Sequence, residues 1–163
     1  MYSMPMDRKD VARLASAILL CELVGGLGSV FAIPSISTWY AGLAKPAFSP
    51  PNWVFGPVWI LLYLLMGVSL YLVWSRGAGN PRAAPALKAF GLQLSLNLLW
   101  SLLFFGLRST AYGLVDIVFL WVAVLVTLLR FRKISSAASW VLVPYLLWVT
   151  FASLLNFYVF VLN

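Results

Sequence analysis

Five long apolar runs dominate this sequence, and they constrain its fold more than any other feature. They cover residues 11–33, 53–74, 86–106, 111–129 and 138–162. A helix needs about 20 apolar residues to cross the hydrocarbon core of a bilayer. Only 9% of the residues are charged, whereas soluble domains carry about 25%. The sequence therefore predicts an all-α membrane protein, with residues 1–163 folded as a single bundle of five transmembrane helices.

The basic residues fall on alternate sides of the five predicted spans. Nine of the 11 Lys and Arg residues lie in three groups of three, around the start of the first span, from the end of the second span to the start of the third, and between the fourth and fifth. The other two are Lys45 and Arg108. Because cytoplasmic loops carry the excess of basic residues, we expect the N-terminus inside and the C-terminus outside. This charge bias suits a prokaryotic cytoplasmic membrane.

The connection over residues 34–52, here called the lid, is unlike an ordinary linker. The segment TWYAGLAKPAFSPPNW (38–53) holds two Trp, one Tyr, one Phe and three Pro. Flexible linkers are rich in Gly and Ser, whereas each Pro fixes its own φ. We expect a stiff, aromatic loop to pack against other parts of the protein. We therefore expect a structured loop that closes a ligand pocket.

Three of the predicted helices carry aromatic and polar residues at helical spacing. Residues three or four positions apart share one face of a helix. The three stripes are Trp59, Tyr63, Gly67, Leu70 and Trp74; Gln93, Asn97, Trp100 and Phe104; and Tyr145, Trp148, Ala152 and Asn156. Helix packing alone explains any single stripe. Together, three stripes whose outer members meet below an aromatic lid favour a pocket.

Two acidic residues lie inside the predicted spans, where charged side chains are costly. Glu22 is either a protonated, hydrogen-bonded side chain or part of a proton relay. Asp116 either ties its helix to a neighbour or binds ligand. We favour the structural role for both residues.

Small residues suggest where helices approach closely in lipid. Gly91 and Ser95 form a short small line that would suit a dimer contact. A longer line, for which we expect a packing seam, consists of Ala17, Cys21, Gly25 and Ser29.

The residue types that are missing exclude several kinds of site. The chain has no His and a single Cys. His is the commonest metal ligand and a usual haem ligand, so we expect no metal site and no covalently bound cofactor. The net charge of +7 is explained by orientation in the membrane, and we expect no nucleic-acid partner.

Five sequence motifs occur in a characteristic order. They are WYAGLAKPAFSPP (39–51), FGPVWILLY (55–63), NLLWSLLFFG (97–106), LVD (114–116) and VPYLLWVTFASLLN (143–156). In these motifs the chain resembles the translocator protein family, also called TspO/MBR, tryptophan-rich sensory protein or peripheral-type benzodiazepine receptor. The resemblance implies a five-helix bundle, often a homodimer, with a pocket closed by the first loop. It also implies binding of porphyrins and, in animals, of cholesterol and synthetic drugs.

Residue by residue, the resemblance implies ligand contacts at Tyr40, Pro50, Trp59, Asn97, Trp100, Trp148 and Ala152. To these we add Trp39 from the lid and Tyr63 and Phe104 from the stripes. Some bacterial members of the family are proposed to degrade protoporphyrin in light with the help of two tryptophans. Their counterparts here would be Trp59 and Trp148.

The chain departs from the family pattern in two places. Phe48 stands where the lid motif often has Trp. The animal cholesterol motif needs a Tyr followed by a basic residue, but here Phe157 takes the Tyr position and no basic residue follows Tyr158. Such motifs are weak indicators in any case. We therefore do not expect a sterol as the native ligand.

We expect an integral membrane binding protein for porphyrins or similar planar hydrophobic molecules, with a ligand such as metal-free protoporphyrin IX held below the lid. Aromatic faces stack on a macrocycle, Asn97 can donate hydrogen bonds, and Lys45 either meets a propionate or lies among lipid headgroups. Two alternatives stay open. One is light-dependent porphyrin breakdown through Trp59 and Trp148. The other is transport of porphyrins, lipids or other small hydrophobic molecules.

Overall fold

The computed structural model describes residues 7–77 and 79–163. Residues 1–6 and residue 78 of the predicted domain lie outside this range. Within it, five helices are long and apolar enough to cross a membrane, which confirms the predicted all-α membrane fold. The elements are α1 (Arg8–Ile36), η1 (Tyr40–Gly42), α2 (Asn52–Arg76), α3 (Ala83–Ser101), η2 (Leu102–Gly106), α4 (Thr110–Arg132) and α5 (Ser136–Leu162).

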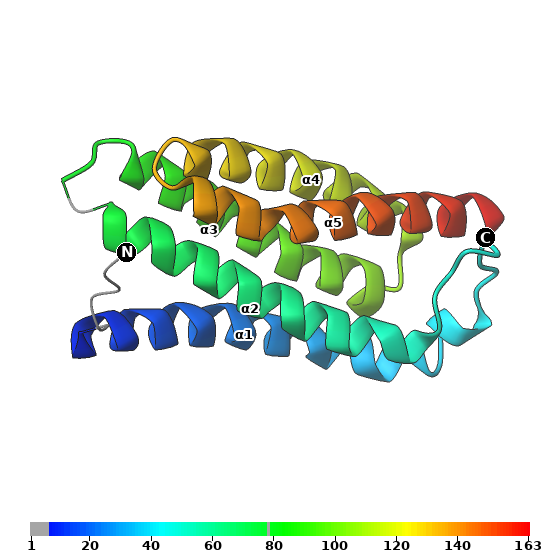
Figure 1. The fold of residues 1–163 in the computed structure, drawn as a ribbon. Coiled ribbons are helices and arrows are strands. Elements are labelled where there is room, and N and C mark those ends of the chain that lie inside the picture. Colours follow the sequence, from blue (N-terminus) through cyan, green and yellow to red (C-terminus); the bar gives the residue numbers. More distant parts are fainter. Residues whose placement is uncertain (1–6, 78) are drawn as a thin grey trace.

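The helices pack side by side along one common direction, as Figure 1 shows. Helix α1 contacts α2 and α3, α2 contacts α5, and α4 contacts both α3 and α5. Around the bundle the order is therefore α1, α2, α5, α4 and α3. The lid joins α1 to α2 at the end of the bundle where α5 finishes (Figure 1). We call this the lid end.

Short polar side chains cap the N-termini of α4 and α5. Ser109 Oγ accepts a hydrogen bond from the backbone N–H of Tyr112 at 3.2 Å, at the start of α4. Ser135 Oγ accepts one from Ala138 at 3.3 Å, at the start of α5. The first N–H groups of a helix have no partner within the helix, so Ser before the first turn is a favoured cap. These caps fix where the two helices leave their loops.

The first helix is longer than the predicted span over residues 11–33. It continues through Pro34 to Ile36, so the first three residues of the lid are helical. Pro34 has no N–H to donate to the carbonyl oxygen of Val30, so this last turn of the helix lacks one hydrogen bond. The Ser35 hydroxyl donates to the backbone oxygen of Phe105 at 2.8 Å, which fastens this last turn to η2. The other spans begin or end within three residues of the predicted positions.

The last turn of the predicted helix over residues 86–106 is a π-helix rather than an α-helix. In η2, the backbone N–H of Leu107 donates to the oxygen of Leu102 at 2.8 Å, five residues earlier. The wider turn brings both Phe104 and Phe105 against the same lid residue, Tyr40. Such turns occur often at functional sites.

Small residues form the contact between α1 and α2. Cys21 is fully buried. A Cβ added to Gly67 would lie 2.5 Å from the Cα of Ile18, and one added to Gly25 would lie 2.5 Å from the ring of Tyr63. Side chains larger than hydrogen would push the helices apart at these points. The predicted packing seam of α1 is confirmed over this part of the helix.

Candidate functional site

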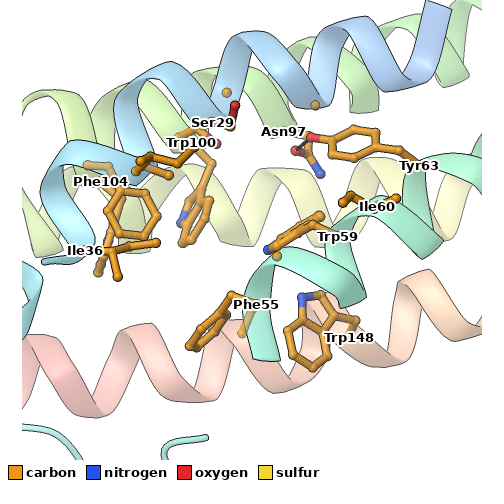
Figure 2. Close-up of a pocket in the computed structure, with 18 of the residues that line it drawn as sticks. Ser29, Ile36, Phe55, Trp59, Ile60, Tyr63, Asn97, Trp100, Phe104 and Trp148 are labelled. Carbon is orange, nitrogen blue, oxygen red and sulfur yellow. Dashed lines mark hydrogen bonds between the residues drawn. The ribbon is translucent and has the colours of Figure 1, made fainter. Parts of the chain in front are cut away.

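A cavity of about 420 Å³ lies at the lid end of the bundle. Ligand pockets usually measure about 300–1,000 Å³. Its walls come from α1, α2, α3 with η2, and α5, and the lid contributes Tyr40. Figure 2 shows aromatic side chains from three of these elements pointing into one space. The cavity is therefore built from segments far apart in the sequence.

Trp59 lies at the centre of the aromatic wall. Its ring centroid is 6.5 Å from that of Trp100 on α3 and 6.5 Å from that of Trp148 on α5. Tyr63, one turn along α2, is 5.8 Å away. Phe55 extends the wall towards the lid, with its centroid 6.1 Å from that of Trp148. A planar ligand in this cavity meets ring faces and ring edges from three helices (Figure 2).

The roof of the cavity is the ring of Tyr40, which is only 4% exposed. It packs against the rings of Phe55, Phe104 and Phe105, with centroids 6.4, 6.1 and 5.9 Å away. Burial raises the pKa of the Tyr40 hydroxyl above its usual value. The roof is thus a neutral phenol at physiological pH.

The only basic residue of the lid, Lys45, folds back onto the lid itself. Its Nζ lies 4.7 Å from the centroid of the Tyr40 ring. It donates hydrogen bonds to the backbone oxygens of Leu43 at 3.1 Å and Ala41 at 3.3 Å. A cation above an aromatic face is an attractive contact. Lys45 therefore stabilises the closed lid in this structure.

The lid is also fastened to the end of α5. The side chain of Asn163 accepts a hydrogen bond from the N–H of Ala44 and donates one to its carbonyl oxygen, both at 3.0 Å. The ring of Phe48 packs edge-on against Phe151 and Tyr158, with centroids 6.2 and 5.4 Å away. These contacts hold the lid closed over the cavity.

A chain of buried hydrogen bonds forms the floor. Tyr63 Oη donates to Asn97 Oδ1 at 2.5 Å, and Asn97 Nδ2 donates to Tyr145 Oη at 2.7 Å. Tyr145 Oη in turn donates to Gln93 Oε1 at 2.9 Å. Buried polar groups are costly unless they are paired, and here they pair with one another. Asn97 therefore has one side-chain N–H left for a ligand.

The two other indole N–H groups on this wall differ in their partners. Trp100 Nε1 donates to Asn156 Oδ1 at 3.1 Å, and Asn156 Nδ2 donates to the backbone oxygen of Thr110 at 2.9 Å. In contrast, Trp148 Nε1 is buried and has no hydrogen-bond partner among the described residues. A buried donor without a partner is uncommon and calls for an explanation. An acceptor on a bound molecule would supply one.

Most of the predicted ligand-binding residues meet in this cavity, namely Tyr40, Trp59, Tyr63, Asn97, Trp100, Phe104, Trp148 and Ala152. Trp39 and Pro50 do not line it. Trp39 packs behind the wall, with its ring edge-on to Phe104 at 5.4 Å between centroids. Pro50 is a half-buried residue of the lid. For these two, position in an aromatic, Pro-rich loop did not indicate which way the side chain faces.

Sequence reasoning missed the contribution of α1. Gly25, Gly26, Gly28 and Ser29 line the cavity, as does Glu22 at its edge. Gly25 and Ser29 were interpreted as part of a packing seam alone. They belong to the seam and also line the cavity, since a helix face without large side chains leaves room for a ligand.

Sequence reasoning also missed Phe55 and Phe105 as lining residues. Phe55 lies four residues before Trp59, so helical spacing would have extended the stripe of α2 to it, whereas Phe105 faces the cavity through the π-turn. Asp116, in contrast, is buried on α4 and is not part of the lining. Its Oδ2 has no hydrogen-bond partner in the described part of the chain.

Comparison with known proteins gives one consistent result. Residues 17–162 match the family described as "TspO/MBR family". The chain is 47% identical to "Tryptophan-rich protein TspO" of Archaeoglobus fulgidus, over 94% of this chain and 99% of that protein. It is 45% identical to the protein of the same name from Chlorobaculum tepidum, over 95% and 98%. It is 40% identical to "Translocator protein" of Homo sapiens, over 80% and 78%.

Proposed function

This chain belongs to the TspO/MBR family, and we propose that it binds metal-free porphyrins or similar tetrapyrroles within the membrane. It is an integral multi-pass membrane protein. The observation that supports the proposal most is the aromatic wall around Trp59, together with the buried, unpartnered N–H of Trp148. A planar, amphipathic molecule with hydrogen-bond acceptors is complementary to both.

Each part of the cavity has a role in this proposal. The faces of Trp59 and Trp100 stack on the macrocycle, and each aromatic pair contributes about 0.5–1.5 kcal/mol beyond the burial of its area. The N–H of Trp148 donates to a pyrrole nitrogen or to a carboxylate. The chain has no His to bind haem iron, so a metal-free ring suits the site better. For Lys45 to reach a propionate, it would have to leave its carbonyl partners in the lid.

A titration in the dark tests this function. Purified protein in detergent is titrated with protoporphyrin IX while tryptophan fluorescence is followed. We expect saturable quenching whose midpoint shifts to higher porphyrin concentration in Trp148→Phe. The matched control is Trp140→Phe on the same helix, because Trp140 is 71% exposed and does not line the cavity. Equal midpoints in both variants would contradict a role for Trp148, and the absence of saturation in the parent protein would contradict the function.

A second candidate is light-dependent breakdown of the bound porphyrin. The paired indoles of Trp59 and Trp148 favour it, because both line the same cavity and their centroids are 6.5 Å apart. The oxidant would be dioxygen, and the ring of the excited porphyrin would be oxidised. Illumination of the complex should then give a new absorption band only with protein. The double variant Trp59→Phe with Trp148→Phe should bind but form no product; product at the parent's rate would rule out this chemistry.

Transport through the bundle has less support. The hydrogen-bonded chain from Tyr63 to Gln93 fills the space below the cavity, and Gln93 Nε2 contacts the sulfur of Met66 beneath it at 3.8 Å. Passage across the membrane would require this buried network to open. Saturable uptake of labelled porphyrin into sealed proteoliposomes, lost in Tyr40→Ala, would favour transport instead.

The proposed orientation has the lid outside and the opposite end inside. Arg82 directly precedes α3 and Arg130 lies in the last turn of α4, both at that opposite end. Cytoplasmic loops carry the excess of Lys and Arg. In right-side-out vesicles, an impermeant maleimide should label Lys45→Cys but not Arg82→Cys. We also propose a homodimer that uses the exposed small residues Gly91 and Ser95 of α3. Leu at both positions should then give monomers in crosslinking experiments.

A further inference from the structure

Helix α1 changes its neighbour along its length. Far from the lid it packs on α2, where a Cβ on Gly67 would meet the Cα of Ile18 at 2.5 Å. Nearer the lid it packs on α3 and η2, where a Cβ on Gly28 would lie 3.0 Å from Ser101 Oγ and where Ser35 bonds to η2. Towards the lid end the cavity lies between α1 and α2, since residues of both helices line it.

Several residues of α1 and α2 both line the cavity and belong to the molecular surface. Ile33 on α1 and Ile60 on α2 line the cavity, yet they are 68% and 63% exposed. Gly26 and Gly56 also line the cavity and are exposed, and a Cβ added to either would have no atom within 4 Å. The cavity wall thus has an opening between α1 and α2, here called the side window. It is bordered by Gly26, Ile33, Gly56 and Ile60.

The side window lies in the membrane-spanning part of both helices and opens towards lipid. The outer face of α1 beside the side window is apolar, with Leu19, Leu23 and Leu27 exposed. Glu22 and Gly26 lie next to these residues on α1 and also line the cavity. An apolar path therefore leads from the lipid-facing surface of α1 through the side window into the cavity.

The lid offers no comparable opening. Asn163 bonds to both backbone groups of Ala44. Within the lid, the ring of Tyr40 is buried against its aromatic neighbours. The ring of Phe48 packs edge-on against Phe151 and Tyr158 of α5. Entry through the lid would have to break these contacts, whereas entry through the side window meets two glycines with free space beside them.

We infer that the ligand enters and leaves the cavity from the bilayer through the side window, while the lid stays closed. This inference rests on the proposed function, because it concerns a ligand that dissolves in the membrane. Glu22, where this apolar face of α1 meets the cavity, is the only acidic residue among the described residues that line the cavity. It offers an acceptor to pyrrole N–H groups on this path.

The experiment measures binding rates in lipid nanodiscs. Protoporphyrin IX is mixed with protein in a stopped-flow instrument, and tryptophan quenching gives the association and dissociation rates. The double variant Gly26→Leu with Gly56→Leu should lower both rates at least about tenfold with affinity changed less than about threefold, since a blocked entrance raises the barrier in both directions. Ala137→Leu is the matched control, because Ala137 is exposed on α5 and lies outside the cavity. It should keep the parent's rates.

Two further variants make the result decisive. Asn163→Ala loosens the lid and should leave the association rate unchanged. Gly26→Cys, labelled with a bulky maleimide after folding, blocks the side window in protein that is already folded, and the native Cys21 is buried. Parent-like rates in the double variant and the labelled protein, or faster association in Asn163→Ala, would overturn the inference while leaving the proposed function intact. No saturable quenching in the parent would overturn the proposed function and this inference with it.

Discussion

The indole ring of Trp148 stands perpendicular to that of Trp59, at an interplanar angle of 89°. The two rings come from α5 and α2, which contact each other in the bundle. Perpendicular rings form a corner, so a planar molecule that stacks on one ring meets the edge of the other. The unpartnered Nε1 of Trp148 lies at this corner. This geometry suits the flat, acceptor-carrying ligand that we propose.

The hydrogen-bonded floor should contribute to stability. Tyr145→Phe removes the hydroxyl that links Asn97 to Gln93 and leaves two buried polar groups without this partner. A buried group left unpaired costs about 1–3 kcal/mol, and we expect the free energy of unfolding in detergent to fall by an amount in that range. Denaturant unfolding followed by circular dichroism measures it. The control is Tyr158→Phe, because Tyr158 is exposed. An unchanged free energy in Tyr145→Phe would contradict the role given to the floor.

The seam between α1 and α2 should not tolerate an added methyl group. In Gly67→Ala the new Cβ would lie 2.5 Å from the Cα of Ile18, which is backbone and has little freedom to move. Overpacking of this kind costs about 1–3 kcal/mol. Thermal unfolding of Gly67→Ala should begin at a lower temperature than that of the parent. Gly91→Ala, where the methyl group meets open space, should unfold like the parent; equal loss in both variants would point to helix backbone effects instead.

Asn163 should slow hydrogen exchange of the backbone amides of the lid. Its side chain accepts the N–H of Ala44 and donates to the carbonyl oxygen of the same residue. Each hydrogen bond contributes about 0.5–1.5 kcal/mol, so amide exchange at Ala44 in Asn163→Ala should become faster by roughly 5-fold or more. Hydrogen–deuterium exchange with mass spectrometry follows the lid peptide, with an α4 peptide as internal control. Unchanged exchange in the lid peptide would show that other contacts hold it.

Asn156 should orient the ring of Trp100. Its Oδ1 accepts the indole N–H, and its own Nδ2 is fixed by the backbone oxygen of Thr110. Asn156→Leu removes this support, and we expect porphyrin affinity to fall by about 2–10-fold, the equivalent of one hydrogen bond. The dark titration measures it. Ser153→Ala on the same helix is the control, because Ser153 bonds only to its own helix backbone, at Val149. Equal affinity in the two variants would show that Trp100 needs no support.

Much of the fold follows from local sequence properties. The apolar runs predicted the five helices because a span must satisfy its own backbone hydrogen bonds in lipid. The stripes brought Trp59, Asn97 and Trp148 to one cavity, since helical spacing decides which residues share a face. These properties depend on residues near each other in the chain.

Other features depend on contacts between distant segments. The helix did not stop before Pro34, because Ser35 bonds across to Phe105. The π-turn that presents Phe105 has no signature in the residues LLFFG. The side window depends on how α1 packs against two other helices, at Gly67 of α2 and at Ser101 of α3. No single helix carries this information.

The central claim is that the ligand occupies the cavity below the lid, and filling that cavity tests it most directly. Ala152 lines the cavity on α5, so Ala152→Phe places a ring where the ligand would lie. The control is Ala137→Phe on the exposed face of the same helix. Equilibrium binding of protoporphyrin IX, followed by the shift of its Soret band, should weaken at least about tenfold in Ala152→Phe and stay unchanged in Ala137→Phe. Parent-like binding by Ala152→Phe, in protein whose unfolding temperature is unchanged, would place the ligand elsewhere and contradict the account.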